Sequence, residues 1–260
     1  MTNTGYESGS LQINNEIGIL HTTWKDNKFI DEQYLKVLLG FKGEDDYFYS
    51  VYALGEWTAL KTSGRIYKKF SDANIVEWSY KDLMPLVVCV DFNVNPMKWA
   101  FIQKHNGVDY IFDELVKEDT YTEEMAKETL LKFGLRSYTF YGDYSGNFRS
   151  TKSNQTDYEI IKQIIPSAII RTQPNPSIVD RVNTVNWRLC NDKEEQPDRR
   201  LFVDPKCTHV LKDFRRVTWK KDRHEEDQTN PELTHISSAI GYYINYEYSL
   251  KKTQATAHWA

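Results

Sequence analysis

Residues 86–91 read Leu-Val-Val-Cys-Val-Asp and place a carboxylate directly after an unbroken apolar run. A continuous β-branched run of this length is typical of a strand that is buried on both faces, which is a central strand of a covered sheet. Burying a carboxylate at the end of such a strand costs free energy unless a positive charge compensates it. The run therefore predicts a sheet that is covered on both faces, with a positively charged partner for Asp91.

The composition is that of a folded protein with room for one large domain, or for one domain and an appendage. Of the 260 residues, 40% are hydrophobic and 14% are aromatic, which excludes a disordered chain. The three cysteines are far apart and form no CxxC pair, so we expect neither a disulfide framework nor a zinc cluster. The formal net charge of −4 argues against a protein covered in nucleic acid but is compatible with a local basic groove.

No apolar run reaches about 18 residues, and the first ten residues lack the apolar core of a signal peptide. We therefore expect neither a membrane span nor secretion. The unpaired cysteines fit a reducing compartment.

From residue 86 onward the sequence alternates short apolar strands with amphipathic helices. Strands are predicted at 98–105 and 108–116, joined by an Asn-Gly hairpin turn. A hairpin followed by alternating helices and strands predicts an α/β fold, a mixed sheet with helices on both faces. Further strands are expected at 137–143, 167–172 and 200–204, and helices at 31–41, 121–133, 156–165, 175–190 and 230–248.

Asp91 and Asp143 each follow a predicted central strand. In open α/β sheets ligands bind beyond the carboxyl ends of the strands. If the two strands are neighbours, two bare carboxylates at ~4 Å would repel by roughly 4 kcal/mol at an effective dielectric of ~20. A shared divalent cation would remove that repulsion, and oxygen ligands suit Mg²⁺ or Mn²⁺. The alternative is that both aspartates only cap the turns that follow the strands.

Four segments in order and spacing resemble the nuclease domain of the large terminase subunit of tailed bacteriophages, a domain with a ribonuclease H-like fold. They are VDFNVNPMKWAFIQ, DELV, YGDYSGNFRSTKSNQTDYEII and THISSAIGYYI. The upstream segments HTTWKDNKFIDEQYL, YALGEW and GRIYKKF resemble the end of the terminase ATPase region and its connector. The resemblance implies residues 1–80 as a remnant of the ATPase region, 81–250 as the nuclease domain and 251–260 as a flexible tail.

The same resemblance implies a metal-dependent DNA endonuclease that cuts concatemeric viral DNA during genome packaging, with two Mg²⁺ or Mn²⁺ ions. Its partners would be double-stranded DNA, the terminase small subunit and the portal protein, in the host cytoplasm. The chain contains no GxxxxGK[ST] phosphate-binding loop, so we expect it to be a C-terminal part without ATPase activity.

By resemblance, Asp91 is the first metal-binding acid and Asp143 is the second. The family's third acid lies in the final helix in the pattern H.SDA..Y, and Ser238 occupies its place here. His235 lies one helical turn earlier on the same face and could be the third ligand or a structural hydrogen-bonding residue. Other candidates are Asp222 and Asp227 as ligands, and Glu114 as an outer acidic group or a surface carboxylate.

Basic residues near these acids are the candidates for phosphate contacts, which dominate DNA affinity. Arg149 and Lys152 follow Asp143 in a polar loop, and a basic run over 211–227 includes Arg215 and Arg216. Alternatively, this basic run is only a solvent-exposed surface that binds no DNA.

Two other functions remain open. One is a non-catalytic docking module for the portal or small subunit, which Ser238 favours. Another is a resolvase- or transposase-like nuclease on the same fold. A glycosidase also uses paired carboxylates, but it would need aromatic sugar platforms beside them, which we do not expect from the sequence.

Overall fold

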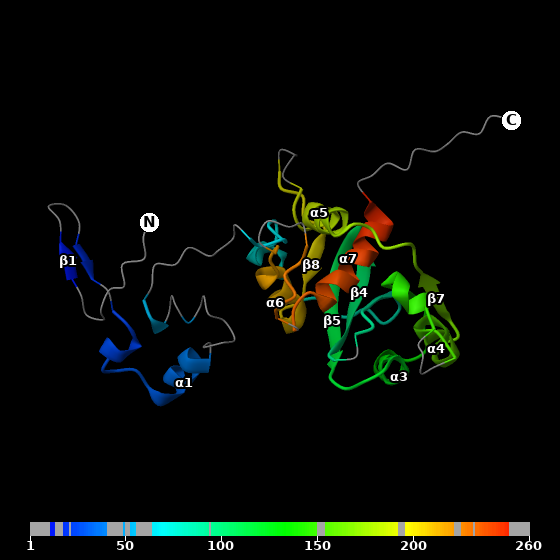
Figure 1. The fold of residues 1–260 in the computed structure, drawn as a ribbon, viewed down its shortest axis with the longest axis horizontal. Coiled ribbons are helices and arrows are strands. Elements are labelled where there is room, and N and C mark those ends of the chain that lie inside the picture. Colours follow the sequence, from blue (N-terminus) through cyan, green and yellow to red (C-terminus); the bar gives the residue numbers. More distant parts are fainter. Residues whose placement is uncertain are drawn as a thin grey trace. The chain divides into compact units, whose positions relative to one another are not determined.

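The computed structural model describes residues 11–13, 18–20, 22–40, 49, 53–55, 64–93, 95–149, 154–191, 196–220, 225–230 and 232–249. The chain forms two compact units, residues 1–63 and 64–260 (Figure 1). The predicted tail, 251–260, lies outside the described residues.

Among its described residues, the first unit has a short antiparallel pair of strands, a 3₁₀ helix (Trp24–Asp26) and one α-helix. Strand β1 (Leu11–Ile13) pairs antiparallel with β2 (Gly18–Leu20). Helix α1 (Glu32–Gly40) follows and confirms the helix predicted at 31–41. Its relation to a terminase ATPase region stays a prediction.

The second unit is built on a mixed sheet in the order β7-β6-β3-β4-β5-β8. The first three of its strands along the chain form an antiparallel meander, whereas β6 and β7 add on in parallel beside β3, and β8 pairs in parallel with β5. This is the mixed sheet that the sequence predicts. The strands are β3 (Leu86–Val90), β4 (Met97–His105), β5 (Val108–Lys117), β6 (Tyr138–Gly142), β7 (Ala168–Arg171) and β8 (Leu201–Val203).

Helices cover both faces of this sheet, as β3 shows. Its residues Leu86, Val88 and Val90 belong to one apolar cluster with side chains of α3 and α4, whereas Cys89 belongs to a second cluster with α5, α6 and α7. The helices lie around the sheet in Figure 1. No helix among the described residues is long and apolar enough to cross a membrane. The helices are α3 (Thr122–Phe133), α4 (Asp157–Ile164), α5 (Ile178–Leu189), α6 (Thr208–Arg216) and α7 (His235–Tyr248).

Local signals explain several element boundaries. Asn106 and Gly107 adopt positive φ angles of 49° and 76°, as the tight hairpin turn requires, and Gly134 ends α3 at φ 69°. Thr156 caps α4 in a capping box with Glu159.

Two helices differ from the sequence-based prediction. Helix α7 begins at His235 rather than at residue 230, because Thr234 just before it is left-handed, with φ 79°. Helix α6 is absent from the prediction, although Val210, Leu211 and Phe214 lie on one buried face. The sequence pattern indicates only a basic run here, because charged residues lie between the apolar ones.

The second unit begins at Gly64, earlier than the domain boundary predicted at residues 80/81. The reason is burial, because Ile66, Tyr67 and Phe70 belong to the core cluster of α5, α6 and α7. The buried Asn74 side chain also donates hydrogen bonds to main-chain oxygens at the end of α5 and in β8.

Candidate active site

Asp91 and Asp143 follow adjacent parallel strands at the same end of the sheet. Strands β3 and β6 pair in register, with Val90 opposite Gly142, so the next residue on each strand is an aspartate. A Cβ on Gly142 would lie 2.6 Å from the main-chain oxygen of Val90. Only glycine therefore allows β6 to approach β3 this closely just before Asp143.

Asp91 has an unsatisfied carboxylate oxygen. Its Oδ2 is buried and accepts no hydrogen bond, which is uncommon for a buried polar atom. Nδ1 of His235 lies 3.3 Å from this oxygen. A buried oxygen in this state is the kind of group that a cation would satisfy.

Asp143 is held by neutral donors on both oxygens. Its Oδ1 accepts hydrogen bonds from the Ser145 amide (2.6 Å) and Asn175 Nδ2 (3.0 Å), and its Oδ2 accepts one from the Tyr242 hydroxyl (3.2 Å). Burial by itself raises the pKa of Asp143, but these hydrogen bonds outweigh it and hold the pKa below its ordinary value. The carboxylate is therefore ionised at neutral pH.

His235 is the first residue of α7, and the fold brings it to the acid pair. Besides its contact with Asp91, its Nδ1 lies 2.8 Å from Nδ2 of Asn93. Asp213 of α6 accepts a hydrogen bond from the Ser237 amide (3.1 Å) and so fixes the first turn of α7. Of the three predicted metal ligands, Asp91 and His235 are in direct contact, and Asp143 follows the neighbouring strand β6.

Ser238, where the sequence resemblance implies a third acid, lies beside a buried ion pair. Nη2 of Arg181 donates to Ser238 Oγ (3.1 Å) and to Glu226 Oε1 (2.8 Å), and the Arg181 and Glu226 side chains are only 4% and 3% exposed. A Cβ on Gly241 would lie 2.6 Å from Arg181 Cγ, so this glycine lets the arginine cross α7. The guanidinium then stacks on Tyr242, 4.8 Å from its ring centroid, and so reaches the residue that donates to Asp143.

The other acidic candidates occupy different places. Asp227 accepts hydrogen bonds from the amide and hydroxyl of Thr229, so it stabilises a turn; the acid next to Ser238 is its neighbour Glu226. Asp222 lies outside the described residues.

Glu114 is neither an outer acidic group nor a simple surface carboxylate. It accepts hydrogen bonds from the main-chain amides of His209 (3.0 Å) and Val210 (3.1 Å). It therefore caps the first turn of α6, where a negative charge is favourable.

The predicted DNA-contact residues are divided between two places. Arg149 is exposed close to the end of β6, and Lys152 lies outside the described residues. Arg215 and Arg216 end α6, where Arg215 pairs with Asp72 (3.0 Å). In the same run Lys212 pairs with Glu232 and Lys220 with Glu225, so acidic neighbours offset much of its charge. A DNA contact by these arginines stays a prediction.

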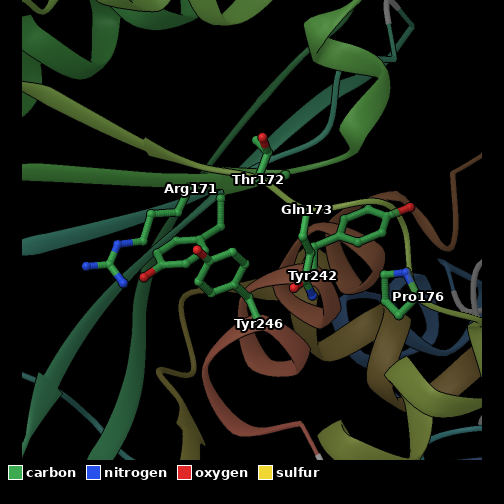
Figure 2. A pocket seen from close by; sticks show the side chains of 8 residues that line it. Arg171, Thr172, Gln173, Pro176, Tyr242 and Tyr246 are labelled. Atoms are coloured by element: carbon green, nitrogen blue, oxygen red, sulfur yellow. The ribbon is translucent and has the colours of Figure 1, made fainter. Parts of the chain in front are cut away.

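An aromatic pocket adjoins Asp143. Figure 2 shows Tyr242 and Tyr246 from α7 beside Arg171, Thr172 and Gln173, which end β7 and follow it. Tyr242 contributes to the pocket and to the hydrogen bonds of Asp143 at once. The sequence-based site lacks Tyr242, although its spacing of seven and four residues after His235 and Ser238 places all three on one helix face.

Within the described ranges, no three His, Cys, Asp or Glu side chains are already grouped as a metal site. The donors nevertheless fit a divalent cation, because Asp91 has a buried oxygen without a hydrogen bond and an imidazole lies beside it. Carboxylate oxygens with one imidazole nitrogen suit Mn²⁺ and other divalent transition-metal ions better than Mg²⁺, which prefers oxygen ligands.

No protein-family model and no curated protein sequence matches the chain. Among solved structures, the large terminase of a thermophilic bacteriophage is 16% identical, with a TM-score of 0.51, over 87% of this chain and 55% of that one. The large terminase nuclease domain of phage P22 is 15% identical, with a TM-score of 0.54, over 72% of this chain and 94% of that one. The chain thus spans about half the length of the thermophilic phage protein, and it has the ribonuclease H-like α/β fold of phage large terminase nuclease domains.

Proposed function

We propose that this chain is a metal-dependent DNA endonuclease, the nuclease part of a phage large terminase that cuts concatemeric DNA during packaging. The observation that carries the proposal is the buried, unsatisfied Oδ2 of Asp91, 3.3 Å from His235 and one strand away from Asp143. The likeness to a structure described as a terminase nuclease domain supports it through the fold.

Asp91, Asp143 and His235 would hold Mg²⁺ or Mn²⁺, with two ions expected. A bound divalent ion supplies positive charge for the phosphodiester and lowers the pKa of bound water. The hydrogen bonds that lower the pKa of Asp143 keep it ionised for this role. Burial raises the pKa of Tyr242 to about 12, so its hydroxyl stays protonated and donates to Asp143. Asn93 orients the His235 ring.

The substrate and partners follow from the same proposal. Double-stranded DNA would be contacted through phosphates by Arg149 and Lys152, and the terminase small subunit and the portal protein would be partners in the host cytoplasm. Without a phosphate-binding GxxxxGK[ST] loop the chain would hydrolyse no ATP by itself.

The test is incubation of the full chain with supercoiled plasmid and Mg²⁺ or Mn²⁺, with EDTA as the control. We expect nicked and linear products without sequence preference, formed less rapidly as salt rises because phosphate contacts dominate binding. Absence of cleavage with both metals would contradict the proposal.

A second candidate is a non-catalytic docking module for the portal or the small subunit. The specific observation in its favour is that Ser238 lies beside the buried Arg181–Glu226 pair. Where the sequence resemblance implies a third metal-binding acid, this chain therefore has a hydroxyl group and a guanidinium. A folded protein that binds no Mn²⁺ in calorimetry and cuts no plasmid would favour this candidate.

A further inference from the structure

The segment directly after Asp143 carries two exposed aromatic side chains. Tyr144 is 37% and Phe148 is 62% exposed, and their rings meet edge-on with centroids 5.8 Å apart. Single exposed apolar residues are common on proteins, but a contacting aromatic pair beside a candidate active site is typical of a ligand-binding surface.

The exposure of this pair is built into a well-anchored segment. A Cβ on Gly146 would lie 2.3 Å from the Phe92 ring, so the backbone between the two aromatics packs directly on the residue that follows Asp91. Asn175 accepts a hydrogen bond from the Tyr144 amide (3.0 Å), and Asn147 donates to Thr172 (3.3 Å). The segment is thus tied to the end of β3 and to the residues after β7.

The surroundings indicate which ligand the pair would contact. The segment starts at Asp143, so a phosphodiester at the acid pair brings its own nucleotides close to Tyr144 and Phe148. Arg149 follows Phe148 and is exposed, and Arg171 and Thr172 line the pocket on the side of β7. Aromatic faces combined with arginines are the usual means of stacking on bases while pairing with phosphates.

We propose that Tyr144 and Phe148 form a stacking platform for an unpaired nucleobase next to the phosphodiester that is cut. The proposal rests on the proposed nuclease function and adds a preference to it. A base can stack on the platform only after it leaves the duplex, and leaving is easiest where pairing is already disrupted. The chain therefore binds DNA with an unpaired bubble more tightly than fully paired DNA.

The experiment measures binding of the full chain, in EDTA to prevent cleavage, to a duplex and to the same duplex with a mismatched bubble that carries 2-aminopurine. We expect the wild type to bind the bubble about tenfold more tightly, as stacking on one aromatic platform allows, and to quench the 2-aminopurine fluorescence. Phe148→Ala should remove both the preference and the quenching, and Phe148→Trp should retain them.

Leu135→Ala is the matched control, because Leu135 is 86% exposed and precedes β6, at the opposite end of that strand from Asp143. It should bind both DNAs as the wild type does, and melting curves should show that every variant is folded. An unchanged bubble preference in Phe148→Ala overturns the platform and leaves the nuclease proposal intact. The same result is expected if the aromatic pair binds a protein partner and not a nucleobase. Failure of the wild type to bind either DNA overturns both.

Discussion

Asp91 and Asp143 directly follow two neighbouring interior strands, at the same end of the sheet, but their environments differ. Asp143 accepts hydrogen bonds on both oxygens, whereas Oδ2 of Asp91 is buried and accepts none. Satisfied hydrogen bonds add to stability, and a buried unsatisfied oxygen costs free energy that a bound cation would recover. A strand-end position therefore does not make two carboxylates equivalent, and Asp91 is the one whose oxygen is left for a cation.

The largest expected effect is on cleavage in Asp91→Asn. The substitution removes the charge at the unsatisfied oxygen, so plasmid cleavage in Mn²⁺ should fall by about 100-fold or more. The free energy of unfolding, measured by urea denaturation in EDTA, should be unchanged or higher, because a buried charge is lost. Full activity in this variant would remove Asp91 from the site.

The next effect concerns His235, the residue in contact with Asp91. If its imidazole is a ligand, His235→Ala should lower Mn²⁺-dependent cleavage by about 10- to 100-fold, and the wild type should prefer Mn²⁺ to Mg²⁺. Coordination needs a neutral ring, so wild-type cleavage should also fall on acidification. A variant that cuts as rapidly as the wild type would make His235 structural.

A matched gain of function is available at Ser238. An aspartate there would supply the third acid that the resemblance to terminase nucleases implies, but it would face Glu226, whose Oε2 lies 3.4 Å from the serine oxygen. We therefore expect Ser238→Asp combined with Glu226→Gln to raise Mg²⁺-supported cleavage more than Ser238→Asp alone, as plasmid assays in each metal would show. Equal rates in the single and double variants would argue against repulsion by Glu226.

A smaller effect separates the two aspartates by stability. In Asp143→Asn an amide group replaces one of two acceptor oxygens, so at least one of the hydrogen bonds from Ser145, Asn175 and Tyr242 is weakened. The free energy of unfolding should fall by about 1–2 kcal/mol in urea denaturation with EDTA, unlike in Asp91→Asn. Similar changes in the free energy of unfolding for Asp91→Asn and Asp143→Asn would show that the two carboxylates do not differ in their contribution to stability.

The smallest effect is a pH dependence of that stability difference. Because the folded protein lowers the pKa of Asp143, the ionised carboxylate contributes stability above its ordinary pKa of about 3.9. This contribution is lost as the pH falls through the lowered value. The difference between wild type and Asp143→Asn, measured by urea denaturation at a series of pH values, should therefore be constant near neutrality and shrink below about pH 4. A difference that grows on acidification would contradict the lowered pKa.

The sequence by itself determined the α/β architecture and the two strand-end aspartates. A short β-branched apolar run such as 86–90 is typical of a strand inside a covered sheet. Turn residues such as Asn106 and Gly107 act locally, so their effect is visible in the sequence. The spacing of His235, Ser238 and Tyr242 on one helix face is equally local, although it does not by itself reveal the hydrogen bond from Tyr242 to Asp143.

Only the tertiary structure decided the environment of each carboxylate. Asn175 and Tyr242 donate hydrogen bonds to Asp143 from distant parts of the chain. Arg181 of α5 pairs with Glu226, which precedes α7, and the two lie beside Ser238 of α7. Hydrogen bonds and ion pairs of this kind depend on how helices pack against the sheet, so the hydrophobic periodicity of the sequence does not predict them. The same physics explains why Glu114, on a strand, caps a helix that follows it by almost a hundred residues.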